Sequence, residues 1–176
     1  NNMPRKPRQS NQPVPFPCVV LVDTREQRPY RFEGIRADAA QGGGPLIVET
    51  AIGTLTSGDY SLSGFPGRVA VERKSLADLF GTIGQGRDRF ERELERLNQM
   101  DFAAVVVEAQ WSEVFDDPPR HSRLCPKTVF RSVNAWEQRY PRVHWSFLPG
   151  RDFAEVKAFR VLERFYRVAT SARVGQ

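Results

Sequence analysis

Three apolar runs that end in charged residues constrain the fold of this chain most strongly. They are CVVLVDTRE (18–26), RVAVERK (68–74) and FAAVVVEAQ (102–110). Continuous apolar runs of this length are typical of strands that are buried on both faces of a sheet. Burying a charge costs on the order of several kcal/mol unless another group compensates it. The charged strand ends therefore lie either in solvent or in a site where the charges offset one another.

The remaining periodicity predicts strands and helices that alternate along the chain. LIVETAI (46–52), GDYSLSG (58–64) and the 68–74 run indicate strands separated by glycine turns, and we expect them to form a meander. After residue 74 helical and strand patterns alternate, which is typical of an α/β protein with a central mixed β-sheet flanked by helices. The other strands are predicted at 102–110 and 143–148, a short helical turn at 111–115, and the helices at 75–83, 87–100, 126–140 and 152–169.

Two of the predicted helices carry clear local signals. Ser75 is followed three residues later by Asp78, the spacing of a capping box at a helix start. In the next helix Phe90, Leu94 and Leu97 recur at i, i+4 and i+7 and form one apolar stripe. Both helices are therefore expected to pack one face against the sheet.

The composition limits the compartment and the partners. The chain has 26 Lys and Arg against 21 Asp and Glu, a net charge of +5, which permits a polyanionic partner without requiring one. Cys18 and Cys125 lie far apart and near no histidine cluster, so neither a disulfide framework nor a zinc site is expected. No apolar run approaches the ~18 residues of a membrane helix. We expect an intracellular, reducing location: the cytoplasm or the nucleoid, or the nucleus in a eukaryote.

The domain boundaries are predicted from composition. Residues 1–17 contain five prolines and three basic residues and predict a disordered basic arm, with Arg5, Lys6 and Arg8 as a hypothetical DNA contact. The globular domain is expected at 18–170, followed by a short tail at 171–176. The first residues contain no apolar stretch typical of a secretory signal.

Two acidic residues and a lysine stand at the ends of neighbouring predicted strands. Residues two apart in a strand point to the same face, so Glu72 and Lys74 project together and Arg73 points away. If the two strands pair, Asp59 comes within reach of the same ion as Glu72. Two carboxylates suit Mg²⁺, which keeps several water ligands, and a lysine beside them can orient a water or stabilise a phosphate. The pattern is typical of metal-assisted phosphodiester hydrolysis, although a solvated Glu-Arg-Lys turn is an ordinary alternative.

The same residues match a known family signature. GDYSLSG…VAVERKSLAD resembles the pattern GD-x(n)-ERK-x3-D of the XPF-type structure-specific endonucleases. Upstream, VDTRE (22–26) is similar to the family's first strand, and downstream GRDRFERELERL (86–97) resembles the helix that follows its active site. The resemblance spans about residues 19–110 and extends more weakly to about 168.

The resemblance implies a restriction-endonuclease-like core that cleaves DNA with Mg²⁺ or Mn²⁺ and needs no small-molecule cofactor. It implies cutting at branched DNA, such as flaps, forks and splayed arms, in repair or recombination, with a 5′-phosphate and a 3′-hydroxyl as products. The roles that it implies are these: Asp59 and Glu72 as the central metal ligands, Lys74 as the residue that positions the attacking water, Asp23 and Glu26 as acidic supports with Asp23 a third metal ligand, Arg25 and Arg73 as phosphate contacts or carboxylate braces, and Asp78 as a residue that fixes the helix start, Arg73 or Lys74.

One feature of the family is not seen in the sequence. Its members commonly carry a tandem helix-hairpin-helix module after the nuclease domain, and this sequence ends at Gln176 without one. We expect either a minimal nuclease or a part of a longer protein. In both cases the branch preference is left open, because that module contributes to it in relatives.

The last predicted helix indicates a second copy of the chain as a partner. Its apolar positions cover more than the narrow stripe of a surface helix, which favours burial against another surface. We expect a homodimer with Trp136 and Phe165 near the interface; a helix covered within its own core is the alternative. The helix carries these apolar residues: Phe153, Val156, Phe159, Val161, Leu162, Phe165, Tyr166 and Val168.

Two other functions remain open from the sequence. A DNA-binding scaffold with the same fold and no catalysis is the first, but Asp23, Asp59, Glu72 and Lys74 are all present, which favours an enzyme. A nuclease of the same core that acts on RNA or on linear duplex ends is the second.

A further basic cluster is either a solvated face or a phosphate-contacting patch: Arg120, Arg123, Lys127 and Arg131.

Overall fold

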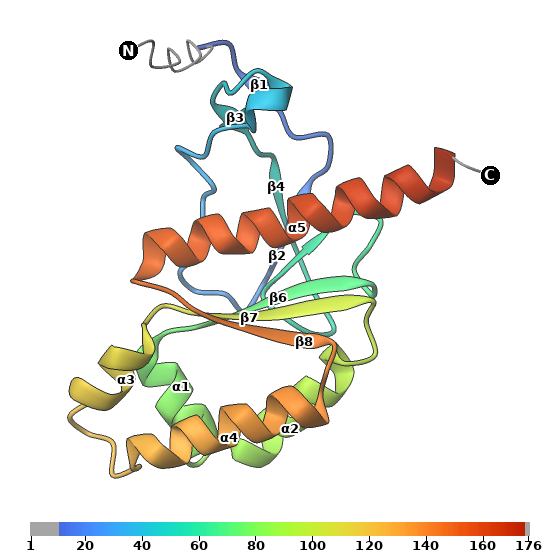
Figure 1. Ribbon diagram of the computed structural model, residues 1–176. Coiled ribbons are helices and arrows are strands. Elements are labelled where there is room, and N and C mark those ends of the chain that lie inside the picture. The colour runs from blue at the N-terminus through green and yellow to red at the C-terminus, as the bar shows by residue number, and fades with distance from the viewer. Residues whose placement is uncertain (1–10, 175–176) are drawn as a thin grey trace, which may run out of the picture.

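A computed structural model describes residues 11–174, which form a sheet with helices on both faces (Figure 1). The arm residues Arg5, Lys6 and Arg8 lie outside this range. The strands are β1 (Val14–Pro15), β2 (Val20–Asp23), β3 (Leu46–Ile47), β4 (Thr50–Gly53), β5 (Tyr60–Leu62), β6 (Val69–Lys74), β7 (Phe102–Val107) and β8 (Val143–Phe147). The helices are α1 (Leu76–Ile83), α2 (Arg87–Leu97), α3 (Trp111–Asp116), α4 (Pro126–Arg139) and α5 (Arg151–Val174), with a short 3₁₀ turn, η1 (Ala39–Gln41).

The main sheet is mixed, as expected, but its strand order differs from the predicted meander. Across residues 11–174 the order is β4-β2-β5-β6-β7-β8. Strands β6, β7 and β8 run parallel, while β5 is antiparallel to both β2 and β6. The meander was wrong because β2 lies between β4 and β5. The physical reason is burial: β2 is apolar and pairs on both sides, whereas β4 is exposed and occupies the edge.

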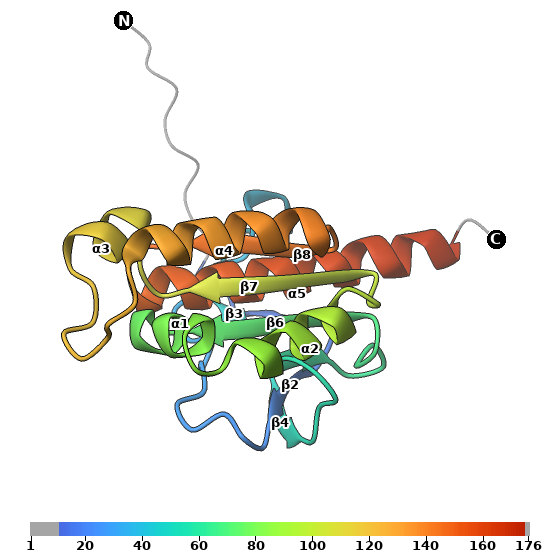
Figure 2. The ribbon, with the colours of Figure 1, turned by 90° about the horizontal axis from the view of Figure 1, so that it is seen from below.

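Each face of the sheet is covered by a separate helical layer. Helix α5 packs on one face, and α1, α2 and α4 lie on the other (Figures 1 and 2). Successive side chains of β7 point to the two layers in turn. Ala104 and Val106 face α5, while Val105 and Val107 face the other helices. Both faces of the central strands are therefore dry, which explains their continuous apolar sequence.

The predicted boundaries at both ends require correction. Val14–Pro15 pairs in parallel with β3, and Phe16 is buried against Phe159 of α5. The ordered domain thus begins before residue 18, because one aromatic side chain anchors the proline-rich segment. At the other end α5 continues to Val174, past the predicted limit at 170. Within residues 11–174 no helix is long and apolar enough to cross a membrane.

One residue predicted for a dimer interface lies inside the chain. Trp136 is 2% exposed and packs between Phe90 and Trp145 in the layer of α2 and α4. Its position on the apolar face of α4 explains this burial. Phe165, by contrast, is only partly buried and lines a groove beside α5. Trp136 is therefore a core residue, and only Phe165 remains available for a partner.

Candidate active site

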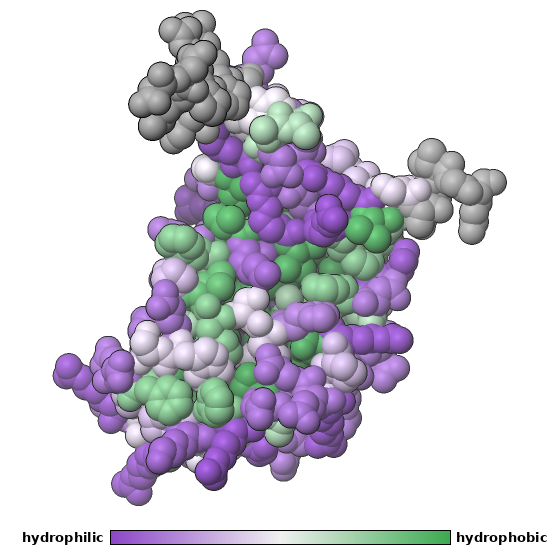
Figure 3. Space-filling view, in the orientation of Figure 1, coloured by the Kyte–Doolittle hydropathy of each residue, from purple (hydrophilic) through white to green (hydrophobic). Residues whose placement is uncertain are grey.

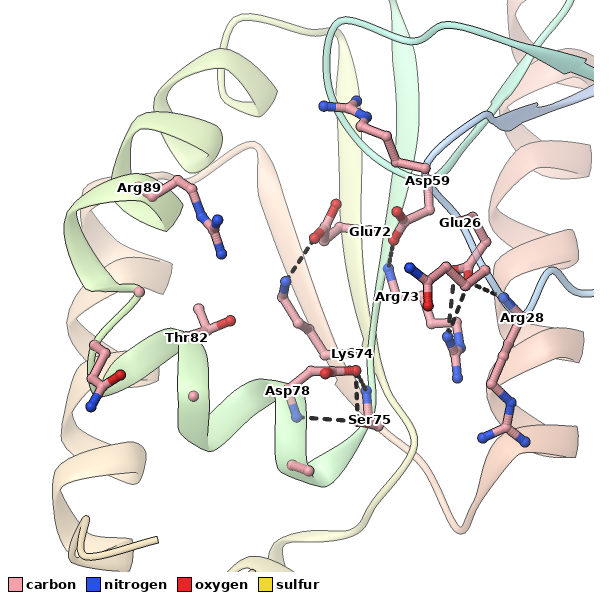
Figure 4. Close-up of a pocket in the computed structure, with 16 residues that line it drawn as sticks. Glu26, Arg28, Asp59, Glu72, Arg73, Lys74, Ser75, Asp78, Thr82 and Arg89 are labelled. Atoms are coloured by element: carbon pink, nitrogen blue, oxygen red, sulfur yellow. Dashed lines mark hydrogen bonds and ion pairs between the residues drawn. The ribbon is translucent and has the colours of Figure 1, made fainter.

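A cleft of about 930 Å³ opens where β6 ends and α1 begins (Figure 4). Its floor is formed by Asp59, Glu72 and Lys74. Thr82 of α1 and Arg89 of α2 stand on one wall. The loop that follows β2 forms the opposite wall and brings Glu26 and Arg28 to the cleft. The structure thus brings together the two carboxylates and the lysine that the sequence predicted.

Main-chain pairing explains why Asp59 faces Glu72. The Asp59 amide donates to the Val71 carbonyl at 2.9 Å, and the Arg73 amide donates to Asp59 Oδ2 at 2.7 Å. Asp59 is therefore held against β6 directly opposite Glu72, the first of the three charged residues that end this strand. The preceding Gly58 has a φ of +80°, and a Cβ there would come within 2.8 Å of the Ala70 Cβ. Only glycine permits this close approach of the turn to β6.

The two carboxylates destabilise each other's charged form. Burial, followed by the charge of Glu72, raises the pKa of Asp59 to about 8. Burial also raises the pKa of Glu72, which is only 9% exposed, although Lys74 opposes this increase. The Lys74 Nζ lies 2.8 Å from Glu72 Oε1 and 4.5 Å from the centroid of the Phe90 ring. One lysine therefore faces two acids, and the floor of the cleft favours the approach of a cation.

The donor set fits a hard divalent cation. Asp59 and Glu72 supply carboxylate oxygens, and a cation between them would offset the burial that raises both pKa values and the charge of Glu72 that adds to the increase for Asp59. Mg²⁺ and Mn²⁺ are bound in this way by one or two carboxylates and several waters. Among residues 11–174, however, no three His, Cys, Asp or Glu side chains gather closely enough to hold a metal. Of the three predicted ligands, Asp59 and Glu72 line the cleft.

Asp23, the third predicted metal ligand, has both carboxylate oxygens engaged in hydrogen bonds. Its Oδ1 accepts from the amide and the Nε of Arg25, and its Oδ2 accepts from the Leu55 amide at 2.7 Å. Burial opposes ionisation of Asp23, but the hydrogen bonds from Arg25 and Leu55 outweigh it and lower its pKa. Asp23 is 2% exposed and does not line the cleft. Asp23 therefore shapes the loop after β2. Arg25 braces the Asp23 carboxylate, which is one of the two roles predicted for this arginine.

Arg73 and Glu26 belong to a network on the far side of β6. The Arg73 Nε and Nη2 contact the two oxygens of Glu108 at 2.6 and 3.0 Å, and its Nη1 lies 3.3 Å from Glu26 Oε1. The Tyr30 hydroxyl donates to Glu108 Oε1 at 2.9 Å. Burial disfavours the charge of Glu108, but these partners outweigh it and lower its pKa. Arg73 therefore braces carboxylates, and Glu26 links this network to the wall of the cleft.

Asp78 fixes the start of α1. Its Oδ2 accepts from the Ser75 amide at 3.3 Å, and its own amide donates to Ser75 Oγ at 3.1 Å. This is the capping box that the sequence predicted. Because α1 begins directly after Lys74, the cap also holds the lysine at the edge of the cleft.

Three functional candidates were missed by the sequence reasoning. Glu108 follows β7 directly, and no local pattern in the sequence relates it to Arg73, its partner in the fold. Arg89 and Glu93 lie four residues apart on α2 and line a second pocket that shares Asp59 and Glu72 with the cleft. In the sequence these residues belong to the polar face of an amphipathic helix. Their i, i+4 spacing showed that they share that face, but not that the face points to the site.

A mixed sheet with helices on both faces, with Glu72 and Lys74 near the end of β6 and Asp59 just before β5, is the architecture of a restriction-endonuclease-like fold. The family model of the ERCC4 domain matches residues 22–146, and the chain belongs to that family. This confirms the resemblance to XPF-type nuclease domains. The match spans β2 to β8 and includes both strands that carry the site.

Solved structures show the same fold. XPF from Aeropyrum pernix aligns at 21% identity with a TM-score of 0.56, over 86% of this chain and 65% of that one. XPF from the same organism in complex with DNA aligns at 22% identity with a TM-score of 0.54, over 88% of this chain and 66% of that one. This chain therefore spans about two thirds of the length of either structure. A comparison with curated proteins finds no match.

Proposed function

We propose that this chain is a Mg²⁺- or Mn²⁺-dependent endonuclease that hydrolyses phosphodiester bonds in branched DNA. One observation carries the proposal: Asp59 and Glu72 repel each other on the floor of an open cleft and face a single lysine. Such an arrangement is costly for folding and useful only when a cation is bound. The DNA complex of XPF from Aeropyrum pernix supports DNA as the substrate class.

The residues of the cleft divide the work of hydrolysis. Asp59 and Glu72 would hold the cation, which when bound neutralises charge on the scissile phosphate. Glu72 fixes Lys74 Nζ at 2.8 Å, so the ammonium group points into the cleft and can donate to the attacking water or to a phosphate oxygen. Arg28 and Arg89 are exposed on opposite walls and would bind neighbouring phosphates of the strand.

The direct test is cleavage of labelled 3′-flap, splayed-arm and plain duplex DNA with Mg²⁺, with Mn²⁺ or with EDTA. We expect metal-dependent cuts near the branch that yield 5′-phosphate ends, and loss of cutting in Asp59→Asn. Tight DNA binding by both proteins without any cutting would favour a scaffold instead. Competition with RNA and with linear duplex ends tests the remaining alternative substrates.

We also propose that two copies of the chain associate through α5. Phe153, Val156 and Val168 are 62%, 41% and 59% exposed, and Phe102 and Phe165 line an adjacent apolar groove of about 620 Å³. Figure 3 shows hydrophobic side chains exposed along α5 and below it, toward the edge of the sheet. Sedimentation equilibrium should give the mass of a dimer, and Phe153→Arg should give that of a monomer. A monomer of the wild-type chain at high micromolar concentration would contradict the dimer.

A DNA substrate implies a compartment that holds DNA. We propose that the protein acts in the cytoplasm or nucleoid, or in the nucleus of a eukaryote, in DNA repair or recombination. Cell fractionation of the tagged chain and sensitivity of a deletion strain to crosslinking agents would test both points. A tagged chain found only outside the cell would contradict this placement.

A further inference from the structure

The turn that presents Asp59 is tied to helix α2 by side chains. The Glu93 Oε1 accepts from the Gly58 amide at 2.8 Å. The Arg96 Nη2 donates to Glu93 Oε2, and the Arg96 Nε donates to the hydroxyl of the buried Ser57 at 3.0 Å. One wall of the cleft is thereby joined to the two residues that precede Asp59.

These bonds act on the two residues before Asp59, Ser57 and Gly58. The β6 strand fixes Asp59 through its own amide and through Oδ2. The residue before it, Gly58, has a left-handed backbone conformation and belongs to no strand. A left-handed glycine is conformationally free in the unfolded chain, so it needs an external partner to select one geometry. Glu93 supplies that partner.

A carboxylate is a costly choice for a packing role at this position. The Glu93 side chain is 18% exposed and lines the pocket that contains Asp59 and Glu72. A third acid beside a repelling pair therefore works against folding unless the site gains from it.

We infer that Glu93 is a positioning residue of the active site, which holds the Gly58 amide and thereby sets where the Asp59 carboxylate stands relative to Glu72. The inference rests on the proposed function, because it gives Asp59 and Glu72 a shared cation. It assigns α2 a second task besides carrying Arg89, since the same helix wall that meets the substrate also aligns the carboxylates. Glu93 acts through Gly58 and is not itself a ligand.

Four variants separate this role from others. Glu93→Gln keeps a hydrogen-bond acceptor for the Gly58 amide but removes the charge. Glu93→Ala removes the acceptor, and Glu93→Asp keeps the charge but shortens the side chain by one methylene. Glu95→Ala is the matched control, because Glu95 lies on the exposed face of the same helix, 3.8 Å from Arg139.

The experiment measures Mn²⁺ affinity by electron paramagnetic resonance, together with kcat and KM for cutting flap DNA. We expect Glu93→Ala and Glu93→Asp to weaken Mn²⁺ binding by about 10-fold, the lower end of the effect of outer-shell residues, and to lower kcat with KM unchanged. Glu93→Gln and Glu95→Ala should stay near the wild type. If Glu93→Ala does not fold, the comparison of Asp with Gln at position 93 decides the question.

Several results would overturn the inference. Wild-type Mn²⁺ affinity in Glu93→Ala or, if it does not fold, in Glu93→Asp would show that the Gly58 bond does not position Asp59. A defect in Glu93→Gln beside wild-type Mn²⁺ affinity in Glu93→Asp would show that charge matters and the hydrogen bond does not. A wild-type chain that binds no Mn²⁺ and cuts no DNA would remove the proposed function and the inference with it. A wild-type chain that does both, beside unaffected variants, removes the inference alone.

Discussion

The two faces of β6 hold charged residues from the same short sequence and differ in how those charges are balanced. On the cleft face, Asp59 and Glu72 share one lysine, and the pKa of each carboxyl is raised. On the other face, Arg73 meets Glu108 with two parallel contacts, and the pKa of Glu108 is lowered. The charges of the far face are balanced by partners within the protein, whereas on the cleft face burial disfavours the charged form of both carboxyls. Adjacent residues of one strand thus serve stability and function separately.

The largest expected effect is on catalysis from the cleft face. Glu72→Gln should lower cutting by more than about 100-fold, because outer-shell partners of a metal alone are worth about 10- to 100-fold and Glu72 is proposed as a ligand. Its free energy of unfolding in EDTA should not fall, since the substitution removes one charge of a repelling pair. Single-turnover cleavage and urea denaturation measure the two quantities. A stable variant with wild-type cutting would contradict the assignment of Glu72.

The next effect is on stability from the far face. Arg73→Met should destabilise the protein by about 3 kcal/mol, because it leaves Glu108 buried without its main partner. Lys74→Met is the matched control one residue away, and it should reduce cutting while costing much less stability, because Glu72 can take up a proton. Equal loss of stability in both variants would show that the two faces do not differ as described.

The two faces also respond to pH in opposite directions. Asp59 has an ordinary pKa of 3.8 that is raised to about 8 in the fold, so its contribution to stability is present at low pH and is lost as the pH rises toward 8. Glu108 has a lowered pKa, so its contribution is present above its ordinary pKa and is lost as the pH falls through its lower folded value. Urea denaturation in EDTA between pH 5 and 9 should show stability falling as the pH rises, with a smaller fall in Asp59→Asn. Identical pH dependence in both proteins would argue against the raised pKa.

The smallest expected effect concerns the helix that begins after Lys74. Ser75→Ala removes the side chain that caps α1 and should cost about 1 kcal/mol of stability. Cutting should change little at a temperature where the variant is folded, because Lys74 is still held by Glu72. Thermal denaturation and a cleavage assay at 20 °C test this. A large loss of cutting without loss of stability would give Ser75 or Asp78 a direct role in the site.

The sequence predicted where strands and helices occur better than it predicted which of them lie side by side. Apolar runs and caps define elements locally, and Ser75 and the Phe90 stripe behave in the structure as expected. Strand order depends on which edges must be buried, and the insertion of β2 between β4 and β5 brings together residues that local patterns cannot relate. For the same reason the anchoring of Phe16 under α5 was missed.

The site was predicted where its residues share a strand or a matched motif. The alternation in β6 was enough to place Glu72 and Lys74 on one face and Arg73 on the other. The contacts of Asp23 could not be predicted, because a sequence shows that a carboxylate is near a site but not that hydrogen bonds already occupy its oxygens. Glu93 was missed because a charged residue on a helix looks the same whether it faces solvent or a cleft.

The central claim is that the cleft face of β6 is incomplete without a cation, and thermal unfolding tests it most directly. Wild type and Asp59→Asn would be melted in EDTA and in saturating Mn²⁺. We predict that the wild type melts at or below the temperature of the variant in EDTA and above it with Mn²⁺, because binding to the folded state alone stabilises it. A wild-type melting temperature that does not respond to Mn²⁺, or that rises equally in the variant, would contradict the account.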